Sequence, residues 1–264
     1  MLLTIEDLDV SFRNEGGEIT SAARDINLTL DRGEVLGLVG ESGSGKSSVA
    51  MSVPRLLPSP PAFWPKGRIL FDGQDTLKMS IEGLRRIRGS RIGVVFQDPI
   101  GSLSPLHRIG DQLVETVRLH RDVSVKVARE QALEWLGKVG IPDPEMRARA
   151  YPHELSGGMQ QRVMIAMGLM LDPDLLIADE PTTALDVTIQ AQVLKLLKEL
   201  HRAHSAVLLI THDLGVVSQL ATRLAVMRDG RVVETSDRPE DFFNNPKHPY
   251  SRTLVGEARR MELT

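Results

Sequence analysis

The 264-residue sequence contains no cysteine. Without a thiol, the chain can form no disulfide, no thiolate zinc site, no cysteine-ligated iron–sulfur cluster and no cysteine nucleophile. An excess of either charge is also missing, because 32 basic residues stand against 35 acidic ones, for a net charge of −3. A dedicated nucleic-acid-binding protein usually carries a basic excess, so we expect neither a nucleic-acid partner nor an iron–sulfur cluster.

Long apolar runs are missing as well. The longest stretch, residues 163–171, has nine residues and contains Gly168, whereas a bilayer-spanning helix needs about 20. The first ten residues, MLLTIEDLDV, carry acids where a signal peptide has lysines. The sequence therefore predicts a chain that is not exported and does not span a membrane by itself.

The remaining pattern predicts an α/β fold. Short apolar runs typical of strands buried on both faces lie at residues 35–39, 92–96, 175–178 and 206–210. Helical spacing of apolar residues follows at 127–139 and 187–203. Strands that alternate with helices form parallel sheets. We therefore expect a parallel α/β core.

Other segments look like additions to that core. Apolar residues alternate with polar ones at 8–12 and again at 26–30, which predicts half-buried strands joined by a turn at 13–18. Five prolines between residues 54 and 65 predict a loop, with the next strand at 67–71. Residues 106–150 are predicted to be helical, and the tail from 252 to 260 is predicted to be a short surface helix end.

A glycine-rich segment carries the strongest chemical signal. It matches the pattern G-x-x-x-x-G-K-[ST] in full, through Gly40, Glu41, Ser42, Gly43, Ser44, Gly45, Lys46 and Ser47. The glycines let backbone N–H groups converge on phosphate oxygens. Lys46 supplies a positive charge to the β- and γ-phosphates, and the Ser47 hydroxyl can bind Mg²⁺. We assign these residues, together with the following Ser48, to the binding of ATP and Mg²⁺.

Two acids end a predicted strand. Asp179 and Glu180 directly follow the apolar residues 175–178, and ligands of parallel sheets bind at the carboxyl ends of the strands. We predict that Asp179 holds Mg²⁺ through water together with Ser47, and that Glu180 polarises the attacking water. The alternative is an exposed strand end that is acidic by chance.

The segment from Leu155 to Gln161, LSGGMQQ, resembles the signature motif of the ATP-binding-cassette (ABC) ATPases. Six pieces of that family occur in order: the phosphate loop, Gln97 after a strand, the signature, the acidic strand end, Ala-Leu-Asp at 184–186, and His212 after a strand. The resemblance covers essentially the whole chain.

The resemblance implies a P-loop NTPase (RecA-like) core with a parallel sheet, an N-terminal antiparallel β subdomain and an inserted α-helical subdomain. Within this single ABC ATPase domain, it assigns residues 1–34 and 66–76 to the antiparallel β part and 98–160 to the helical signature part. It assigns residues 35–53, 91–97 and 161–235 to the nucleotide-binding core, and 236–264 to a C-terminal extension.

The resemblance also implies a mechanism, in which two cassettes stack head to tail around two ATP molecules. The signature of each chain caps the γ-phosphate held by the other, through Leu155, Ser156, Gly157, Gly158, Met159 and Gln160. Gln97 senses Mg²⁺ and the attacking water, and His212 contacts the γ-phosphate. Asp186 connects the two sites, and Phe12 stacks on adenine.

Each of these last four residues also has a structural interpretation. Gln97 could be a polar strand end, Asp186 a helix cap, His212 a structural histidine and Phe12 a core residue.

Further segments resemble the peptide and nickel importer branch of the family. They are FQDPIGSLSP at 96–105, Met159 after the two signature glycines, and HPYS at 248–251. Many members of the branch carry a cysteine-bearing tail with an iron–sulfur cluster, and this cysteine-free sequence departs from them in that respect.

The branch implies an ATPase on the cytoplasmic face of the membrane that drives import. Its partners would be two permease subunits, a second ABC ATPase (a paralogue or a second copy) and an extracytoplasmic substrate-binding protein. The permease's coupling helix would dock in a groove between the core and residues 98–150. The expected cargo is a peptide. The alternatives are nickel or a metal chelate, an ATPase of a soluble enzyme complex such as carbon–phosphorus lyase, and an ATPase of translation or DNA repair.

Overall fold

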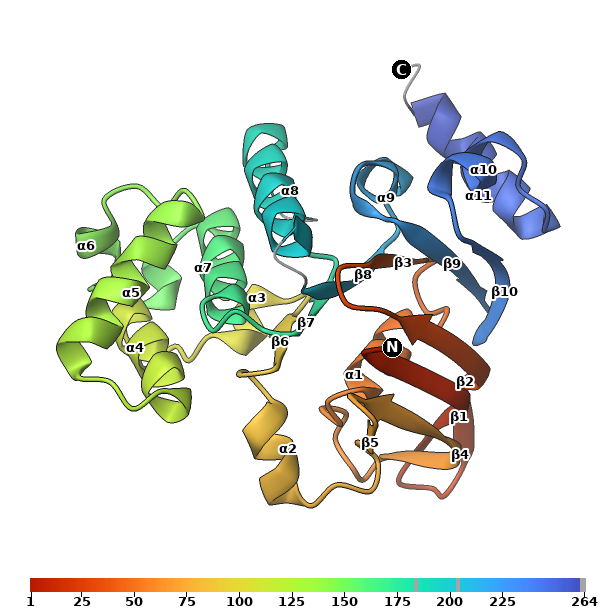
Figure 1. Cartoon of the computed structure of the whole chain (residues 1–264), viewed down its shortest axis with the longest axis horizontal. Helices are drawn as coiled ribbons and strands as arrows, with labels where there is room; N and C mark the ends of the chain where they lie inside the picture. Colours follow the sequence, from red (N-terminus) through yellow and green to blue (C-terminus); the bar gives the residue numbers. More distant parts are fainter. Residues whose placement is uncertain (183–184, 203–204, 262–264) are drawn as a thin grey trace. The chain divides into compact units, whose positions relative to one another are not determined.

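A computed structural model describes residues 1–182, 185–202 and 205–261 of the chain. The chain forms two compact units, Met1–Leu84 with Ala206–Thr264, and Arg85–Ser205. Figure 1 shows both units with their helices and strands labelled.

The first unit contains an antiparallel sheet of strand order β2-β1-β4-β5. Its strands are β1 (Leu3–Arg13), β2 (Ile19–Leu30), β4 (Ala62–Phe71) and β5 (Gln74–Asp75). The predicted alternation along β1 is confirmed for residues 8–10, because Leu8 and Val10 are buried while Asp9 is not. It fails at residues 11 and 12, where Ser11 is buried and Phe12 only half-buried, because the pairing with β2 shifts register after Val10. The predicted turn between β1 and β2 is also confirmed.

The start of β4 corrects one prediction. The strand begins at Ala62, five residues before the expected Gly67, and therefore includes Pro65. The pairing of β4 with β1 shifts register beside this proline, since Ser11 pairs with Phe63 but Asp9 pairs with Lys66. A proline is tolerated at such an irregularity because its missing N–H removes no regular ladder bond.

The first unit also holds parallel strands. β3 (Val35–Val39) pairs in parallel with β8 (Ala206–Thr211) on one side and with β9 (Arg223–Arg228) on the other. β10 (Arg231–Ser236) pairs antiparallel with β9. Every residue of β3 and β8 is buried, as the apolar runs predicted. Helices α1 (Lys46–Ser52), α9 (Leu214–Leu220), α10 (Pro239–Asn244) and α11 (Pro249–Met261) complete the unit, and α2 (Ile81–Ile87) crosses into the second one.

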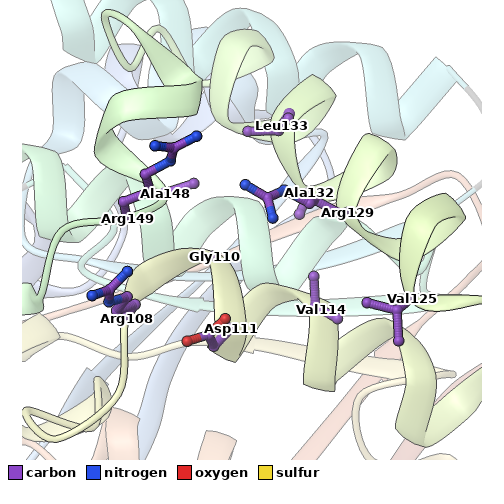
Figure 2. Close-up of a pocket in the computed structure, with 10 residues that line it drawn as sticks. All are labelled: Arg108, Gly110, Asp111, Val114, Val125, Arg129, Ala132, Leu133, Ala148 and Arg149. Atoms are coloured by element: carbon purple, nitrogen blue, oxygen red, sulfur yellow. The ribbon is translucent and has the colours of Figure 1, made fainter.

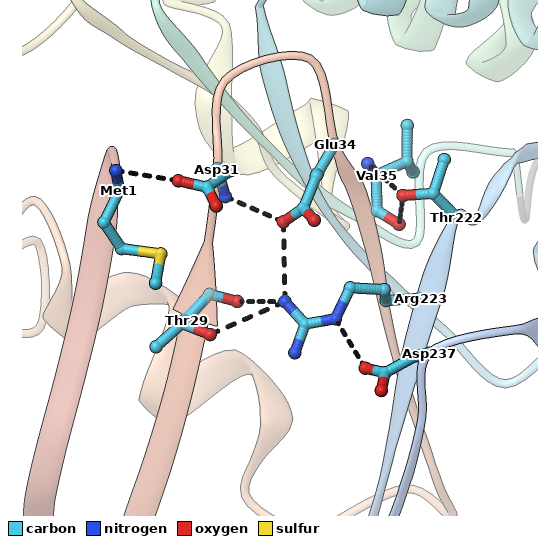
Figure 3. Close-up of polar contacts among 8 residues, drawn as sticks. All are labelled: Met1, Thr29, Asp31, Glu34, Val35, Thr222, Arg223 and Asp237. Atoms are coloured by element: carbon cyan, nitrogen blue, oxygen red, sulfur yellow. Dashed lines mark hydrogen bonds and ion pairs between the residues drawn. The ribbon is translucent and has the colours of Figure 1, made fainter.

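One guanidinium links the two sets of strands within the first unit. Arg223 donates through Nη1 to the Thr29 carbonyl at 3.2 Å and pairs with Glu34 at 3.4 Å. Its Nε pairs with Asp237 at 3.2 Å (Figure 3). The planar fork of arginine suits several fixed acceptors at once. This residue therefore joins β2 of the antiparallel sheet to β9 and to the segment that follows β10.

The C-terminal helix is more extensively packed than predicted. The sequence predicted only a surface helix end at 252–260, but α11 begins at Pro249, and its apolar residues Tyr250 and Val255 are buried together with Ser251. Both belong to a cluster that includes Val39 and Phe242. The apolar residues of this helix are difficult to recognise among the charged residues of the tail. They share one face only when the helix is taken to begin before residue 252.

The second unit places helices around two parallel strands, β6 (Ile92–Val95) and β7 (Leu175–Asp179), in which Val94 pairs with Ile177. Its helical elements are α3 (Pro99–Ser102), α4 (Ile109–His120), α5 (Val125–Lys138), α6 (Pro144–Arg147), the 3₁₀ turn η1 (Pro152–Glu154), α7 (Gly157–Leu169) and α8 (Val187–Arg202). The helical prediction for residues 106–150 is confirmed. The α/β class and the separate antiparallel sheet are confirmed too, whereas the finer subdomain boundaries stay a prediction.

In the described part of the chain, no helix combines the length and apolar character that crossing a bilayer requires.

Candidate functional site

The phosphate loop connects β3 to α1, as the motif predicts. Two of its glycines are required by the chain's own packing, since a Cβ on Gly40 would lie 2.2 Å from the carbonyl oxygen of Met227, and one on Gly45 would lie 2.2 Å from that of Ala22. Both also have positive φ angles, 151° and 99°. Only glycine fits such a conformation this close to another backbone.

Lys46 lies inside the loop. Its side chain is buried, and its ammonium donates to the carbonyl oxygens of Gly40 and Glu41, each at 2.7 Å, and to the Ser44 hydroxyl at 3.2 Å. The loop therefore wraps around a fixed positive charge. Convergent amides around a lysine form a site for phosphate groups. Ser42 and Gly43 are exposed, while Ser47 and Ser48 in the first turn of α1 are half-buried.

Two distant segments support the loop within the first unit. The Gly230 amide, in the turn between β9 and β10, donates to the Ser44 carbonyl at 3.2 Å. The Glu41 amide donates to the phenolic oxygen of Tyr250 at 2.9 Å. Burial raises the pKa of the Tyr250 phenol. Sequence reasoning used Tyr250 only as a marker of the branch. The His-Pro-Tyr segment was visible in the sequence, but the contact of its tyrosine with Glu41 was not.

The other predicted residues of the first unit lie on strand ends. His212 is exposed directly after β8, and the following Asp213 caps α9 by accepting from the amides of Gly215 and Val216. Phe12 is half-buried near the end of β1, paired with Thr20 and Ala62. The contacts of His212 and Phe12 with ATP stay predictions.

In the second unit, the predicted polar strand ends come together. β6 and β7 are parallel neighbours, so the residues that follow them lie at one edge of the sheet. The Gln97 amide donates to a carboxylate oxygen of Glu180 at 3.2 Å. Asp179, the last residue of β7, is buried.

Glu180 has a left-handed backbone conformation, with φ at 47°. Six of the eight non-glycine residues with positive φ in the described chain are aspartates, which tolerate this region. A glutamate gains no such local compensation, and the conformation costs about 1–2 kcal/mol. Strain of this kind concentrates at functional sites, which is consistent with the role predicted for Glu180.

The residues predicted to hold a metal offer only oxygen ligands: the Ser47 hydroxyl, the Asp179 carboxylate and the Gln97 amide oxygen. Mg²⁺ prefers hard oxygen donors and keeps several waters, so this donor set fits the ion. Among the described residues, no group of three or more His, Asp or Glu side chains forms a metal cluster.

The signature segment leads into the start of α7. Ser156 caps the helix, since its hydroxyl accepts from the Met159 amide at 3.4 Å. Ser156 and Gly157 are exposed, and a Cβ on Gly157 would meet no described atom within 4 Å. Exposed amides at the start of a long helix attract anions.

Three further signature residues lie beside this exposed pair. Gly158 and Met159 are half-buried, and Leu155 is buried. The buried Gln160 side chain donates to the carbonyls of Pro152 and Leu155 at 2.9 and 3.1 Å. Gln160 therefore holds the turn that presents Ser156.

Asp186 is confirmed as a helix cap, because its carboxylate accepts from the Ile189 amide at 3.0 Å at the start of α8. Its predicted role between two cassettes stays a prediction. Ala184, the first residue of the predicted Ala-Leu-Asp loop, lies outside the described residues.

A pocket of about 410 Å³ lies among α4, α5 and the segment after α6 (Figure 2). Three arginines line it, Arg108, Arg129 and Arg149, beside a single acid, Asp111, and apolar residues such as Leu133. This pocket belongs entirely to the second unit.

Comparison with known proteins adds the following. A family profile described as ABC transporter matches residues 23–183. The chain is 48% identical over 262 residues to the oligopeptide transport ATP-binding protein of Bacillus subtilis, covering 99% of this chain and 73% of that protein. It is 49% identical over 263 residues to the dipeptide transport ATP-binding protein of the same organism, covering 99% and 78%.

Solved structures agree. A dimeric ATP-binding cassette in a post-hydrolysis state, bound to ADP and Pi, matches with a TM-score of 0.81 at 30% identity. The match covers 89% of this chain and 97% of that one.

Proposed function

Because the chain belongs to the ABC transporter family of ATP-binding proteins, in the branch of the oligopeptide and dipeptide transport proteins, we propose that it is the ATP-hydrolysing subunit of a peptide importer. The contact between Gln97 and the strained Glu180 at the ends of β6 and β7 carries the hydrolytic part of this proposal. The peptide cargo rests on the names of the two Bacillus subtilis relatives.

The loop residues bind and orient the triphosphate. The amides from Gly43 to Ser48 point phosphate oxygens toward the buried Lys46, which neutralises part of their charge. Glu180 accepts a hydrogen bond from the attacking water, and Gln97, which contacts Glu180 at 3.2 Å, orients that carboxylate. His212 contacts the γ-phosphate, and Phe12 stacks on adenine.

Mg²⁺, when bound, supplies charge neutralisation at the β- and γ-phosphates, and Ser47, Asp179 and Gln97 would hold it. The chain's own side chains and amides position the water and the phosphates for hydrolysis.

The exposed start of α7 supports a sandwich of two cassettes. Ser156 presents a hydroxyl and Gly157 presents a helix amide, and both residues are exposed. In this proposal, neither group binds the nucleotide of its own chain. They would cap the γ-phosphate bound by the phosphate loop of a second cassette, a paralogue or another copy. Asp186 would connect the two composite sites.

The second unit supports a docking role for the helices between residues 106 and 149. Of the eight exposed large hydrophobic side chains in the described chain, five lie in this region: Leu106, Leu119, Val125, Val127 and Met146. Exposed apolar residues beside an arginine-lined pocket suit a partner that is apolar and carries acidic groups. We assign this surface to a permease subunit, which would place the chain on the cytoplasmic face of the membrane.

The test is a tagged pull-down from mildly solubilised native membranes, with the co-purifying chains identified by mass. Two permeases are expected, with or without a second cassette, and a captured extracytoplasmic binding protein would then lead to the peptide. A soluble set of enzyme subunits without permeases would overturn the transport function. Arg149→Glu, in the pocket, should weaken permease capture, whereas Lys198→Glu, an exposed charge on α8 outside residues 106–149, should not.

A further inference from the structure

We propose that Tyr250 is a positioning residue of the nucleotide site: its phenol holds the phosphate loop, and through it Lys46, in the geometry that receives ATP. The proposal rests on the function proposed above, in that it takes ATP to be the ligand of the loop. Tyr250 lies at the start of α11, 209 residues from its partner Glu41 in the sequence.

Several contacts fix the tyrosine itself. Its ring is buried in the cluster that contains Val39 and Phe242. The Arg228 guanidinium lies over the ring, 4.8 Å from its centroid. The tyrosine amide donates to the His248 ring nitrogen at 3.2 Å.

The segment before the tyrosine is fixed in turn by Glu234 on β10. The carboxylate of this residue accepts from the amides of Lys247 and His248 at 2.9 and 2.8 Å. Burial pushes the pKa of Glu234 upward, but the two backbone hydrogen bonds and the nearby Ser251 and His248 side chains together outweigh it, and the pKa lies below its ordinary value. A carboxylate that keeps its charge holds both amides firmly.

The phenol contacts the loop at Glu41, whose backbone also binds Lys46. The Glu41 amide donates to the phenolic oxygen at 2.9 Å, and the Glu41 carbonyl accepts from the Lys46 ammonium at 2.7 Å. Lys46 has a second acceptor in the adjacent Gly40 carbonyl. A shift of residues 40 and 41 therefore moves two of the oxygens that surround the ammonium.

The contact uses the hydroxyl and not the ring, which makes a clean substitution possible. Tyr250→Phe keeps the ring in its cluster and removes only the hydroxyl, which accepts from the Glu41 amide. Losing one neutral hydrogen bond should raise the Kd and KM for ATP about fivefold. Because the change acts on binding and not on the attacking water, kcat should stay within about twofold.

A second readout needs no nucleotide. Hydrogen exchange of the Glu41 amide, followed in the peptide that spans residues 40–46, should become several-fold faster in Tyr250→Phe. A tyrosine that only packs would leave this exchange rate unchanged.

Two matched variants separate positioning from packing. Val255→Ala loosens the same helix in the same cluster without touching the phenol. It should lower Tm and leave the Kd for ATP unchanged, the reverse of the pattern expected for Tyr250→Phe. Tyr151→Phe removes the other tyrosine hydroxyl of the chain, in the second unit, and should change neither.

The inference is overturned if Tyr250→Phe binds ATP like the unaltered protein, or if its Glu41 amide exchanges at the unaltered rate. If the unaltered protein binds no ATP, that result contradicts the proposed function and not the positioning role of Tyr250. Faster exchange in the variant would then still show that the phenol holds the loop.

Discussion

The phosphate loop and the signature segment are both glycine-rich, and both lead into a helix. The physical reason for a glycine at a given position nevertheless differs between them. At Gly45 a side chain would collide with the Ala22 carbonyl oxygen at 2.2 Å, and the φ angle of 99° excludes most residues. At Gly157 a side chain would meet no described atom within 4 Å, and the residue is helical. The first glycine is explained by this chain's own packing.

The glycine of the signature segment needs another explanation. A glycine at an exposed helix position costs stability relative to alanine, and among the described residues no close contact compensates for it at Gly157. A ligand or partner that approaches the backbone closely would account for it. This difference supports the sandwich of two cassettes, and it can be tested from both sides.

The largest expected effect comes from Glu180→Gln. This variant should trap the dimer in which the phosphate loop of one cassette faces the signature segment of the other. The rate of ATP hydrolysis should fall by a factor of about 10²–10⁴, because the carboxylate that polarises water is lost. ATP binding should persist, and a dimer with bound ATP should accumulate on gel filtration. The exposed Glu199→Gln on α8 is the matched control. Hydrolysis at the unaltered rate in Glu180→Gln would exclude this residue as the general base.

Lys46→Ala acts on the phosphate loop alone. Removing a buried ammonium that binds phosphate should weaken ATP binding by a factor of at least about 100. Titration with a fluorescent ATP analogue measures this effect. Lys138→Ala, on the surface of the second unit, should bind the analogue normally. Tight binding by Lys46→Ala would show that the enclosed charge is only structural.

Gly45→Ala tests the claim that packing demands this glycine. The collision and the positive φ together should lower the free energy of unfolding by about 3 kcal/mol or more, measured by urea denaturation. Gly43→Ala is the matched control, because Gly43 has a φ of 80° but no described atom within 4 Å of its would-be Cβ. It should cost only the strain of about 1–2 kcal/mol. Equal losses in the two variants would contradict the packing argument.

Ser156→Arg tests the signature segment. The exposed position has room for the new side chain in the single chain, so ATP binding by the monomer should be unaffected. Loss of the hydroxyl that caps α7 should lower the free energy of unfolding by about 0.5–2 kcal/mol. The added bulk and charge should block ATP-driven closure of the dimer, which is best followed in the Glu180→Gln background. A normal ATP-bound dimer in that double variant would contradict the sandwich.

The smallest expected effect is that of Gly157→Ala on stability, a gain of up to about 1 kcal/mol from better helix propensity. The same change should weaken the ATP-driven dimer, since in the proposed sandwich the added methyl group would face the second cassette. Gly137→Ala, also a helical glycine with no described atom within 4 Å of its would-be Cβ, should stabilise α5 without affecting dimerisation. Loss of stability in Gly157→Ala would contradict the comparison.

The sequence foretold much of the site because its signals are local. The phosphate-loop pattern, the buried run of β3 and the acids at the end of β7 are each contained in about ten residues, and all were placed correctly. The contact of Gln97 with Glu180 was not predicted, but it agrees with the rule that neighbouring parallel strands present their carboxyl ends at the same edge.

Errors arose where a distant segment determined the conformation. Pro65 suggested a loop, but a register shift against β1 accommodates it in a strand. Residues 252–260 looked like a surface helix end, but the helix begins at Pro249 and the first unit buries Val255. In both places the local pattern was outweighed by contacts with residues far away in the chain.

The motifs, the positions of the buried strands and the chemical type of the site residues were thus encoded in the sequence by itself, because each depends on neighbours within a few residues. Folding in three dimensions decided which glycines are obligatory, which arginine joins the strands of the first unit, and that a phenol 209 residues away braces the phosphate loop. The physical reason is that close packing and hydrogen-bond geometry act between atoms that meet only after the chain has folded.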